Sequence, residues 1–194
     1  MDPLLIDVPE RIETERLVLR RARPGDGAAL CEAVRESFDR LRPWMPWALA
    51  ETSPDESEAT VRRMHAQFAA REDLALLIFE RAAGGAEGEY VGGTGLHRID
   101  WKVPRFDIGY WCRTRFEGRG LVAEAVRALA RMAFDQLAAA RVEIRMDDRN
   151  VASRRVAERA GFSFEGVLRR ELRANDGRLR DTRVYARVRG IEEP

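Results

Sequence analysis

Lysine is nearly missing from this chain. Of its 34 Lys and Arg residues only Lys102 is a lysine, so a lysine Schiff base or a lysine-based phosphate loop has almost no place to form. Cysteine is equally scarce, because Cys31 and Cys112 are the only two and lie far apart. Two distant cysteines in apolar patterns give neither a disulfide framework nor zinc-ligand spacing. We therefore expect both thiols to be small core residues in a reducing compartment.

Long apolar segments and an excess of one charge are also missing. The longest apolar run covers residues 74–79, whereas a membrane-spanning helix needs about 20 apolar residues. Residues 1–10 contain two aspartates and two prolines instead of a basic region followed by an apolar one, which argues against a secretory signal. The 34 basic and 33 acidic residues leave a net charge of +1. We predict a cytoplasmic protein that binds neither membranes nor, directly, nucleic acid.

The familiar nucleotide, hydrolase and metal motifs do not occur. The sequence has no GxxxxGK[ST], GxSxG, HExxH or CxxC, and Gly92-Gly93-Thr94-Gly95 lacks the spacing of GxGxxG. The motifs typical of kinases, serine hydrolases, metalloproteases and dehydrogenases are therefore missing. We predict no metal site.

The chain is long enough, and at 45% hydrophobic apolar enough, for one domain over residues 1–194, with a core over about 12–189. Residues 121–137 give the strongest helical pattern, because Val122, Val126 and Leu129 fall on one face. Periodicity and turn residues also predict helices over 30–41, 54–71 and 151–160, and strands over 16–21, 74–81, 90–99, 105–113, 141–147, 162–168 and 182–188. The order predicts an α/β (α+β) fold with antiparallel hairpins and one parallel strand–helix–strand unit over 108–147.

The turn before the strong helix has the chemistry of an anion site. Its sequence, RFEGRG over 115–120, places two glycines where the backbone can approach a ligand closely. The helix that follows presents about four unpaired N–H groups and the positive end of its dipole, which together bind phosphate oxygens. The alternative is that the glycines only end a strand and start a helix, and RxxGxG by itself does not separate the two.

Further motifs surround this turn in a fixed order. Arg115-x-x-Gly118-x-Gly120 is followed by Asn150-x-x-Ser153 and by Gly161-Phe162. Upstream are ETERLVLR over 13–20, WMPW over 44–47 and GYW over 109–111. This series resembles the GNAT N-acetyltransferase superfamily, and within it the RimJ/RimL-type branch that acetylates protein N-terminal amines. The resemblance covers residues 12–187.

The resemblance implies a mostly antiparallel twisted sheet whose two central strands splay apart around acetyl-CoA. Those strands would be the ones ending near 110–113 and lying at 141–146. Amides of the 117–122 segment would hold the pyrophosphate, while backbone near 111–113 would pair with the pantetheine arm. The implied cofactor contacts are Trp111, Cys112, Arg113, Arg115, Glu117, Gly118, Arg119, Gly120, Leu121, Val122, Asn150, Ser153 and Arg155 or its neighbour Arg154. Arginine at 115 stands where the family most often has glutamine, and would add positive charge near the phosphates.

The resemblance also suggests catalytic roles. Ser153 matches the serine proposed to protonate the departing thiolate, although its hydroxyl could instead only cap a helix. His97 and Asp107 are candidate bases, yet a single strand histidine is often structural and some enzymes of this type need no base. A strand N–H near Trp111 or Cys112 would stabilise the oxyanion. No activated cysteine is evident, which agrees with direct transfer.

Acceptor residues are predicted in two places. Trp44 and Trp47 lie in the connection where the family places a wall of the acceptor site, and Tyr110 could form another wall. All three could equally pack the end of the core. Residues 169–183 contain six arginines and three acids, which favours an ordinary solvated hairpin over a partner-binding surface.

These observations predict direct acetyl transfer from acetyl-CoA to a primary amine. The branch implies a ribosomal or other protein N-terminus as acceptor. A small-molecule amine acetyltransferase, acting on an antibiotic, amino acid or polyamine, is the alternative within enzymes. A non-catalytic acyl-CoA sensor is the alternative outside them. The sequence leaves a homodimer open.

Overall fold

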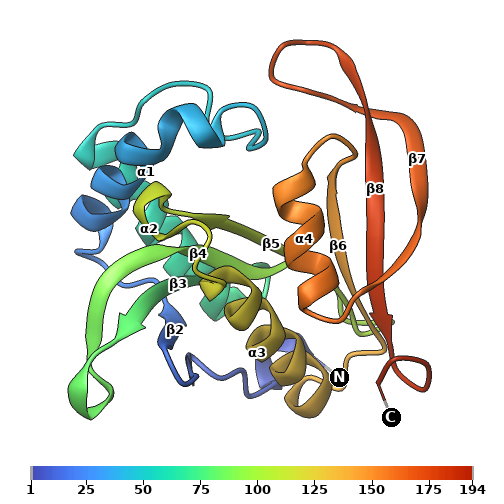
Figure 1. Ribbon diagram of the computed structural model, residues 1–194. Coiled ribbons are helices and arrows are strands. Elements are labelled where there is room, and N and C mark those ends of the chain that lie inside the picture. The colour runs from blue at the N-terminus through green and yellow to red at the C-terminus, as the bar shows by residue number, and fades with distance from the viewer. Residues whose placement is uncertain (1, 194) are drawn as a thin grey trace.

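The computed structural model describes residues 2–193, which form one eight-stranded sheet with helices on both faces (Figure 1). The strands lie in the order β1-β2-β3-β4-β5-β6-β8-β7. Their bounds are β1 Arg11–Glu13, β2 Leu17–Arg21, β3 Leu74–Arg81, β4 Glu87–Asp100, β5 Arg105–Cys112, β6 Arg141–Asp147, β7 Ser163–Arg173 and β8 Leu179–Val188. The α-helices are α1 Gly27–Leu41, α2 Pro54–Ala70, α3 Leu121–Gln136 and α4 Val151–Arg159, and short 3-10 turns are η1 Pro3–Leu5, η2 Ala83–Gly85 and η3 Thr114–Phe116. The predicted α/β fold is confirmed.

Two apolar layers hold the helices to the sheet. The apolar stripe of α3 packs into the larger core, where Val126 and Leu129 are fully buried. Helices α1 and α2 cover the other face, and Leu30 and Val61 pack there against strand residues such as Leu77. Each fully buried side chain of this size stabilises the fold by about 1.5–3 kcal/mol. The period-3.6 pattern of α3 therefore determines which side of that helix meets the sheet.

The sheet opens between β5 and β6. These two strands run parallel, as predicted, but pair only from Arg105 to Asp107 against Arg141 to Glu143. Beyond that point β6 continues along β8 as far as Asp147, and β5 continues along β4 as far as Cys112. The later parts of β5 and β6 therefore have no shared ladder, which is the splayed arrangement that the resemblance implied.

The β7–β8 hairpin is longer than the sequence predicted and extends beyond the splay (Figure 1). At its tip the Asn175 side-chain amide donates to the Arg42 carbonyl at 2.7 Å and to the Met45 carbonyl at 2.9 Å. The hairpin therefore contacts the connection between α1 and α2 across the open end of the sheet. No helix within residues 2–193 is long and apolar enough to cross a membrane.

Candidate active site

The turn that precedes α3 presents its backbone outward. Gly118 and Gly120 both have φ of +76°, a left-handed conformation that side chains with a Cβ rarely adopt. Glu124 N–H is the first amide of α3 to bond back into the helix, and it donates to the Gly120 carbonyl. The N–H groups of the first helical turn, beginning at Leu121 and Val122, therefore have no intrahelical acceptor. Together with the helix dipole they form a cradle for anionic oxygens.

The residues present fit the diphosphate of coenzyme A. A Cβ on Gly118 would meet nothing within 4 Å, so a ligand can approach that backbone closely. A phosphate accepting from amide N–H groups gains charge-assisted hydrogen bonds without needing a nearby lysine. The Glu117 N–H, by contrast, already donates to the Thr114 carbonyl at 3.1 Å. The backbone N–H groups that are available to a phosphate therefore begin after Glu117.

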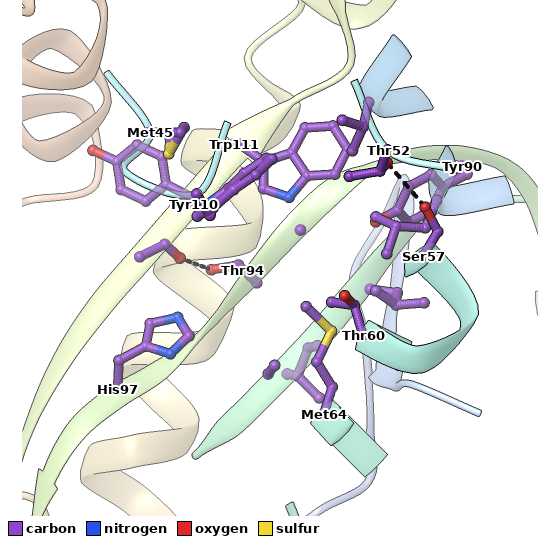
Figure 2. A pocket seen from close by; sticks show the side chains of 18 residues that line it. Met45, Thr52, Ser57, Thr60, Met64, Tyr90, Thr94, His97, Tyr110 and Trp111 are labelled. Carbon is purple, nitrogen blue, oxygen red and sulfur yellow. Dashed lines mark hydrogen bonds between the residues drawn. The ribbon is translucent and has the colours of Figure 1, made fainter. Parts of the chain in front are cut away.

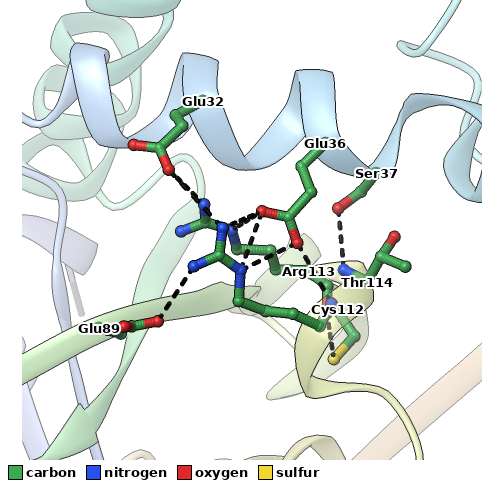
Figure 3. A network of polar contacts seen from close by, with 8 residues as sticks. Glu32, Glu36, Ser37, Glu89, Cys112, Arg113 and Thr114 are labelled. Carbon is green, nitrogen blue, oxygen red and sulfur yellow. Dashed lines mark hydrogen bonds and ion pairs between the residues drawn. The ribbon is translucent and has the colours of Figure 1, made fainter.

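The arginines beside this turn face elsewhere. Arg115 lies 2.6 Å from Glu36 and 3.4 Å from Glu89, and Arg113 is buried against Glu36 at 2.7 Å (Figure 3). These guanidinium groups lower the pKa of Glu36 to about 2 through hydrogen bonds and charge attraction. Arg115 stays a predicted phosphate contact, and carboxylates of α1 and β4 compensate its charge.

The two charged residues next to the glycines are also paired. Glu117 accepts from Arg40 at 2.9 Å, and Arg119 donates to Glu80 at 2.7 Å. Their side chains are therefore tied to α1 and β3, and what this segment offers a ligand is mainly its backbone.

Strand β5 directs alternate backbone groups toward the splay. The Arg113 N–H donates to the Val91 carbonyl at 2.8 Å, so this amide faces β4 and is not available to a pantetheine carbonyl. Because backbone groups alternate along a strand, those of Tyr110 and Cys112 face the opposite edge, where β6 has separated. Trp111 instead uses its ring, which makes an edge contact with Trp47. Of the three predicted positions, Cys112 best fits strand-like pairing with an amide-bearing ligand.

Cys112 is poorly suited to act as a nucleophile. Burial raises the pKa of its thiol to about 12, and Glu117 adds to the effect. A thiol in such surroundings stays protonated at neutral pH, whereas thiolates are the reactive form. Both cysteines are free, as predicted, and Cys31 is buried.

Asn150, Ser153 and Tyr110 meet across the splay. The Asn150 carboxamide oxygen caps α4 by accepting from the Ser153 N–H at 3.0 Å. The Tyr110 hydroxyl lies 2.9 Å from Ser153 Oγ and donates to the Ser153 carbonyl at 3.0 Å. Burial raises the pKa of Tyr110 well above its ordinary value, so the phenol stays protonated. The structure thus places Tyr110 against Ser153, a contact that the sequence did not reveal.

The two candidate arginines of α4 differ in exposure. Arg154 approaches Glu158, one helical turn later, at 3.8 Å, and Arg155 is exposed. The geometry therefore leaves Arg155 the more accessible of the two for a ribose phosphate.

A cavity of about 520 Å³ lies on the other side of β5, beneath α1 and α2 (Figure 2). It is lined by Leu30, Val34, Met45, Trp47, Thr52, Ser57, Thr60, Met64, Ala75, Leu76, Leu77, Tyr90, Gly93, Thr94, His97, Gly109, Tyr110 and Trp111. Within the described residues 2–193, this lining contains no Asp, Glu, Lys or Arg. The cavity is therefore an apolar site with hydroxyl groups and a single imidazole.

Trp47 and Trp44 have different positions. Trp47 lines the cavity, remains 49% exposed, and has its ring centroid 6.0 Å from that of Trp111. Trp44 is half-buried and does not line the cavity, so only one of the two predicted tryptophans lies at this site.

Three glycines allow rings to lie across the strands below the cavity. A Cβ on Gly93 would come within 2.6 Å of Trp111 Nε1. Cβ atoms on Gly95 and Gly109 would come within 2.9 Å of the His97 ring. The GGTG segment does not have the spacing of a dinucleotide-binding motif, and the close packing of rings explains why glycine is needed at two of its positions.

His97 is paired with a residue that the sequence analysis missed. Its Nδ1 lies 2.7 Å from Asp73 Oδ2, just before β3, and its ring lines the cavity. The other candidate base, Asp107, is paired with Arg98 at 3.5 Å and does not line the cavity. Burial raises the pKa of Asp107, and Glu143 adds to the shift. Only His97 therefore lies where it can reach an acceptor in this cavity.

Comparison with known proteins agrees with this geometry. Residues 16–163 match the family model described as an acetyltransferase (GNAT) domain. The protein YdaF of Bacillus subtilis (strain 168) is 33% identical over 165 residues, which cover 83% of this chain and 85% of the relative. The ribosomal-protein-serine acetyltransferase of Escherichia coli (strain K12) is 25% identical over 186 residues, covering 94% of this chain and 96% of the relative.

Solved structures show the same fold. RimL, a ribosomal-protein α-N-acetyltransferase in complex with coenzyme A, superimposes with a TM-score of 0.83 at 26% identity, covering 92% of this chain and 98% of its own. Within residues 2–193 no group of three His, Cys, Asp or Glu side chains could hold a metal ion. The family match covers most of the chain, and the splayed strands and the amide cradle before α3 agree with it. The chain therefore belongs to the GNAT acetyltransferase family and is an acyltransferase that uses acetyl-CoA.

Proposed function

We propose that this enzyme acetylates the α-amine of a peptide or protein N-terminus. The observation that carries the proposal is the uncharged, apolar cavity that adjoins the Ser153–Tyr110 hydroxyl pair. A peptide N-terminus bears a single amine next to a side chain, and an apolar cavity of about 520 Å³ can enclose such a side chain. The names of the E. coli relative and of RimL describe acetylation of ribosomal proteins, which supports the same substrate class.

A polycationic acceptor fits this cavity less well. Polyamines and aminoglycosides carry several positive charges, and burying them beside apolar residues without partners costs free energy. The cavity lining supplies no carboxylate from residues 2–193 to compensate such charges. The small-molecule alternative is therefore disfavoured for polycations.

Two proton transfers are needed, one to the leaving sulfur and one from the amine, and they take place on opposite sides of β5. When bound, acetyl-CoA supplies the activated acetyl group. The Ser153–Tyr110 pair holds a proton close to the splay, where it can be donated to the leaving sulfur. The backbone N–H of Tyr110 or Cys112 faces the splay and can donate to the carbonyl oxygen as negative charge develops there. His97 lies in the cavity wall, where it can accept the proton that the amine loses.

Substitution at Ser153 tests this assignment. Turnover should fall about 100-fold in Ser153→Ala, at the lower end of the roughly 10²–10⁴-fold contribution of a general acid, with coenzyme A affinity nearly unchanged. The readout is free-thiol release with N-terminal peptides, polyamines and aminoglycosides as acceptors. Ser163→Ala, at an exposed position at the start of β7, is the matched control and should behave as the unmodified enzyme. Activity on polyamines but not on any peptide would contradict the proposed acceptor.

A further inference from the structure

The Asp73–His97 pair differs from the many arginine–carboxylate pairs of this protein because it includes a histidine that lines the cavity. Among residues 2–193 His97 is the only ion-pair partner of Asp73, at 2.7 Å. Both side chains are half-buried, with 26% of Asp73 and 34% of His97 exposed. The pair connects the segment before β3 to β4, and its histidine lines the cavity.

The contact determines which imidazole nitrogen is free. A carboxylate accepts hydrogen bonds, so Asp73 holds the neutral ring with its proton on Nδ1. The lone pair then lies on Nε2, as it does when a carboxylate orients a catalytic histidine.

Two glycines let that nitrogen lie close to the backbone of β4 and β5. Cβ atoms built on Gly95 and Gly109 would each lie 3.0 Å from His97 Nε2. Since neither residue has a Cβ, the ring can lie close over both strands. Gly109 immediately precedes Tyr110, whose hydroxyl contacts Ser153. His97 Nε2 thus lies over Gly109, and the next residue of β5, Tyr110, contacts Ser153.

The nearby charges do not supply an alternative partner. Asp107, across the strand pair from His97, is engaged with Arg98 at 3.5 Å. The cavity lining contributes no other charged group from the described residues. Asp73 is therefore the group that orients His97.

We propose that Asp73 is a positioning residue that holds His97 as the general base for the acceptor amine. The amine nitrogen forms a bond to the acetyl carbon and loses a proton to His97 Nε2, from which it passes to solvent. The carbon–sulfur bond breaks, and the sulfur takes a proton from the Ser153–Tyr110 pair, which solvent replenishes. This proposal rests on the proposed function, because it requires an amine acceptor in the cavity.

A double-mutant cycle tests the proposal. Asp73→Asn should lower kcat about 10–100-fold and leave the KM for acetyl-CoA within about twofold, because it removes the orienting carboxylate but no cofactor contact. His97→Gln should lower kcat by at least as much. The double variant should be no slower than His97→Gln alone, since Asp73 acts only through the ring. Asp73→Glu should recover part of the lost rate.

Two controls separate this mechanism from damage to the fold. Glu72→Gln removes one negative charge from the exposed neighbour of Asp73 and should leave kcat unchanged. Thermal melting and coenzyme A titration of each variant will show whether the fold and the cofactor site persist.

The outcomes distinguish the proposal from the function on which it rests. Independent, multiplicative losses in the double variant, or unchanged kcat in folded Asp73→Asn, would overturn the role of Asp73 while peptide acetylation stands. Absence of peptide acetylation by the unmodified enzyme would overturn the proposed function itself.

Discussion

The two sides of β5 use opposite chemistry to receive their ligands. On the cofactor side, Arg113, Arg115 and Arg119 surround the turn, yet each is paired with a carboxylate. On the acceptor side, the described lining of the cavity has no such charges at all. The proposed cofactor side thus offers backbone amides to a polyanion, and the proposed acceptor side offers an amine an apolar enclosure with one imidazole.

This difference indicates that backbone amides in a fixed orientation can bind a phosphate without an unpaired basic side chain. Amides at a helix start are fixed by the fold, so binding a phosphate there requires little reorganisation. A long arginine side chain loses rotamer freedom when it is ordered, whereas these arginines are already ordered by their carboxylates. The proposed acceptor side instead offers apolar walls around a single histidine.

The largest effect is expected where the amide cradle is deformed. Gly120→Val should weaken coenzyme A binding about 100-fold, or about 2.7 kcal/mol, because a left-handed φ of +76° is costly for valine and the turn must shift its N–H donors. Isothermal titration measures the change.

The matched control for that substitution is Gly161→Val. Gly161 also has a left-handed φ, of +83°, with open space around its Cβ position, but it follows α4. It should lose comparable stability and keep coenzyme A affinity. Equal affinity losses in both variants would show that the amide cradle is not specific.

A smaller effect is expected when a charge enters the acceptor cavity. Met64 of α2 lines it, and Met64→Glu should lower kcat/KM for peptides with an apolar first residue about tenfold while improving turnover of a polyamine. Met64→Gln, of the same size without charge, is the control. If both variants treated the two acceptors alike, the apolar enclosure would not determine specificity.

The smallest effect is expected on stability, when Glu36, which pairs with Arg113 and Arg115, is changed. The folded-state pKa of Glu36, about 2, lies below its ordinary value of 4.5, so its contribution to stability is present above about 4.5 and is lost as pH falls toward 2. Glu36→Gln should therefore melt at a lower temperature than the unmodified enzyme at pH 7, and this difference should narrow between pH 4.5 and 2. A difference that stays constant with pH would exclude Glu36 as its source.

Periodicity predicted the central elements closely. The helix predicted over 121–137 is α3, Leu121–Gln136, because a wide apolar stripe needs only local sequence to be recognised. The strand over 74–81 was predicted at its observed bounds, since six of its residues are buried in succession. The exposed β1 was missed, and β7 was predicted to end five residues too early, because neither strand has a buried face to give an alternating pattern.

The site was only partly predictable. The turn at 115–120 has a local signature, so its backbone role could be inferred from glycine and helix-start chemistry. The direction of Arg115 depends on Glu36, which lies 79 residues earlier. The Asp73–His97 and Tyr110–Ser153 contacts likewise join residues that only the paired strands and α4 bring together. Long-range contacts of this kind leave no periodic trace in the sequence.

The reach of the β7–β8 hairpin has a mechanical consequence. The halves of the sheet on either side of the splay share only three paired positions at one end, and Asn175 fastens the hairpin to the 42–45 segment at the other. The open end of the splay is therefore bridged only by side-chain hydrogen bonds, while a single apolar core around α3 joins the two halves of the sheet. Two such hydrogen bonds contribute only about 1–3 kcal/mol, so the bridge is weak compared with the core that the halves share.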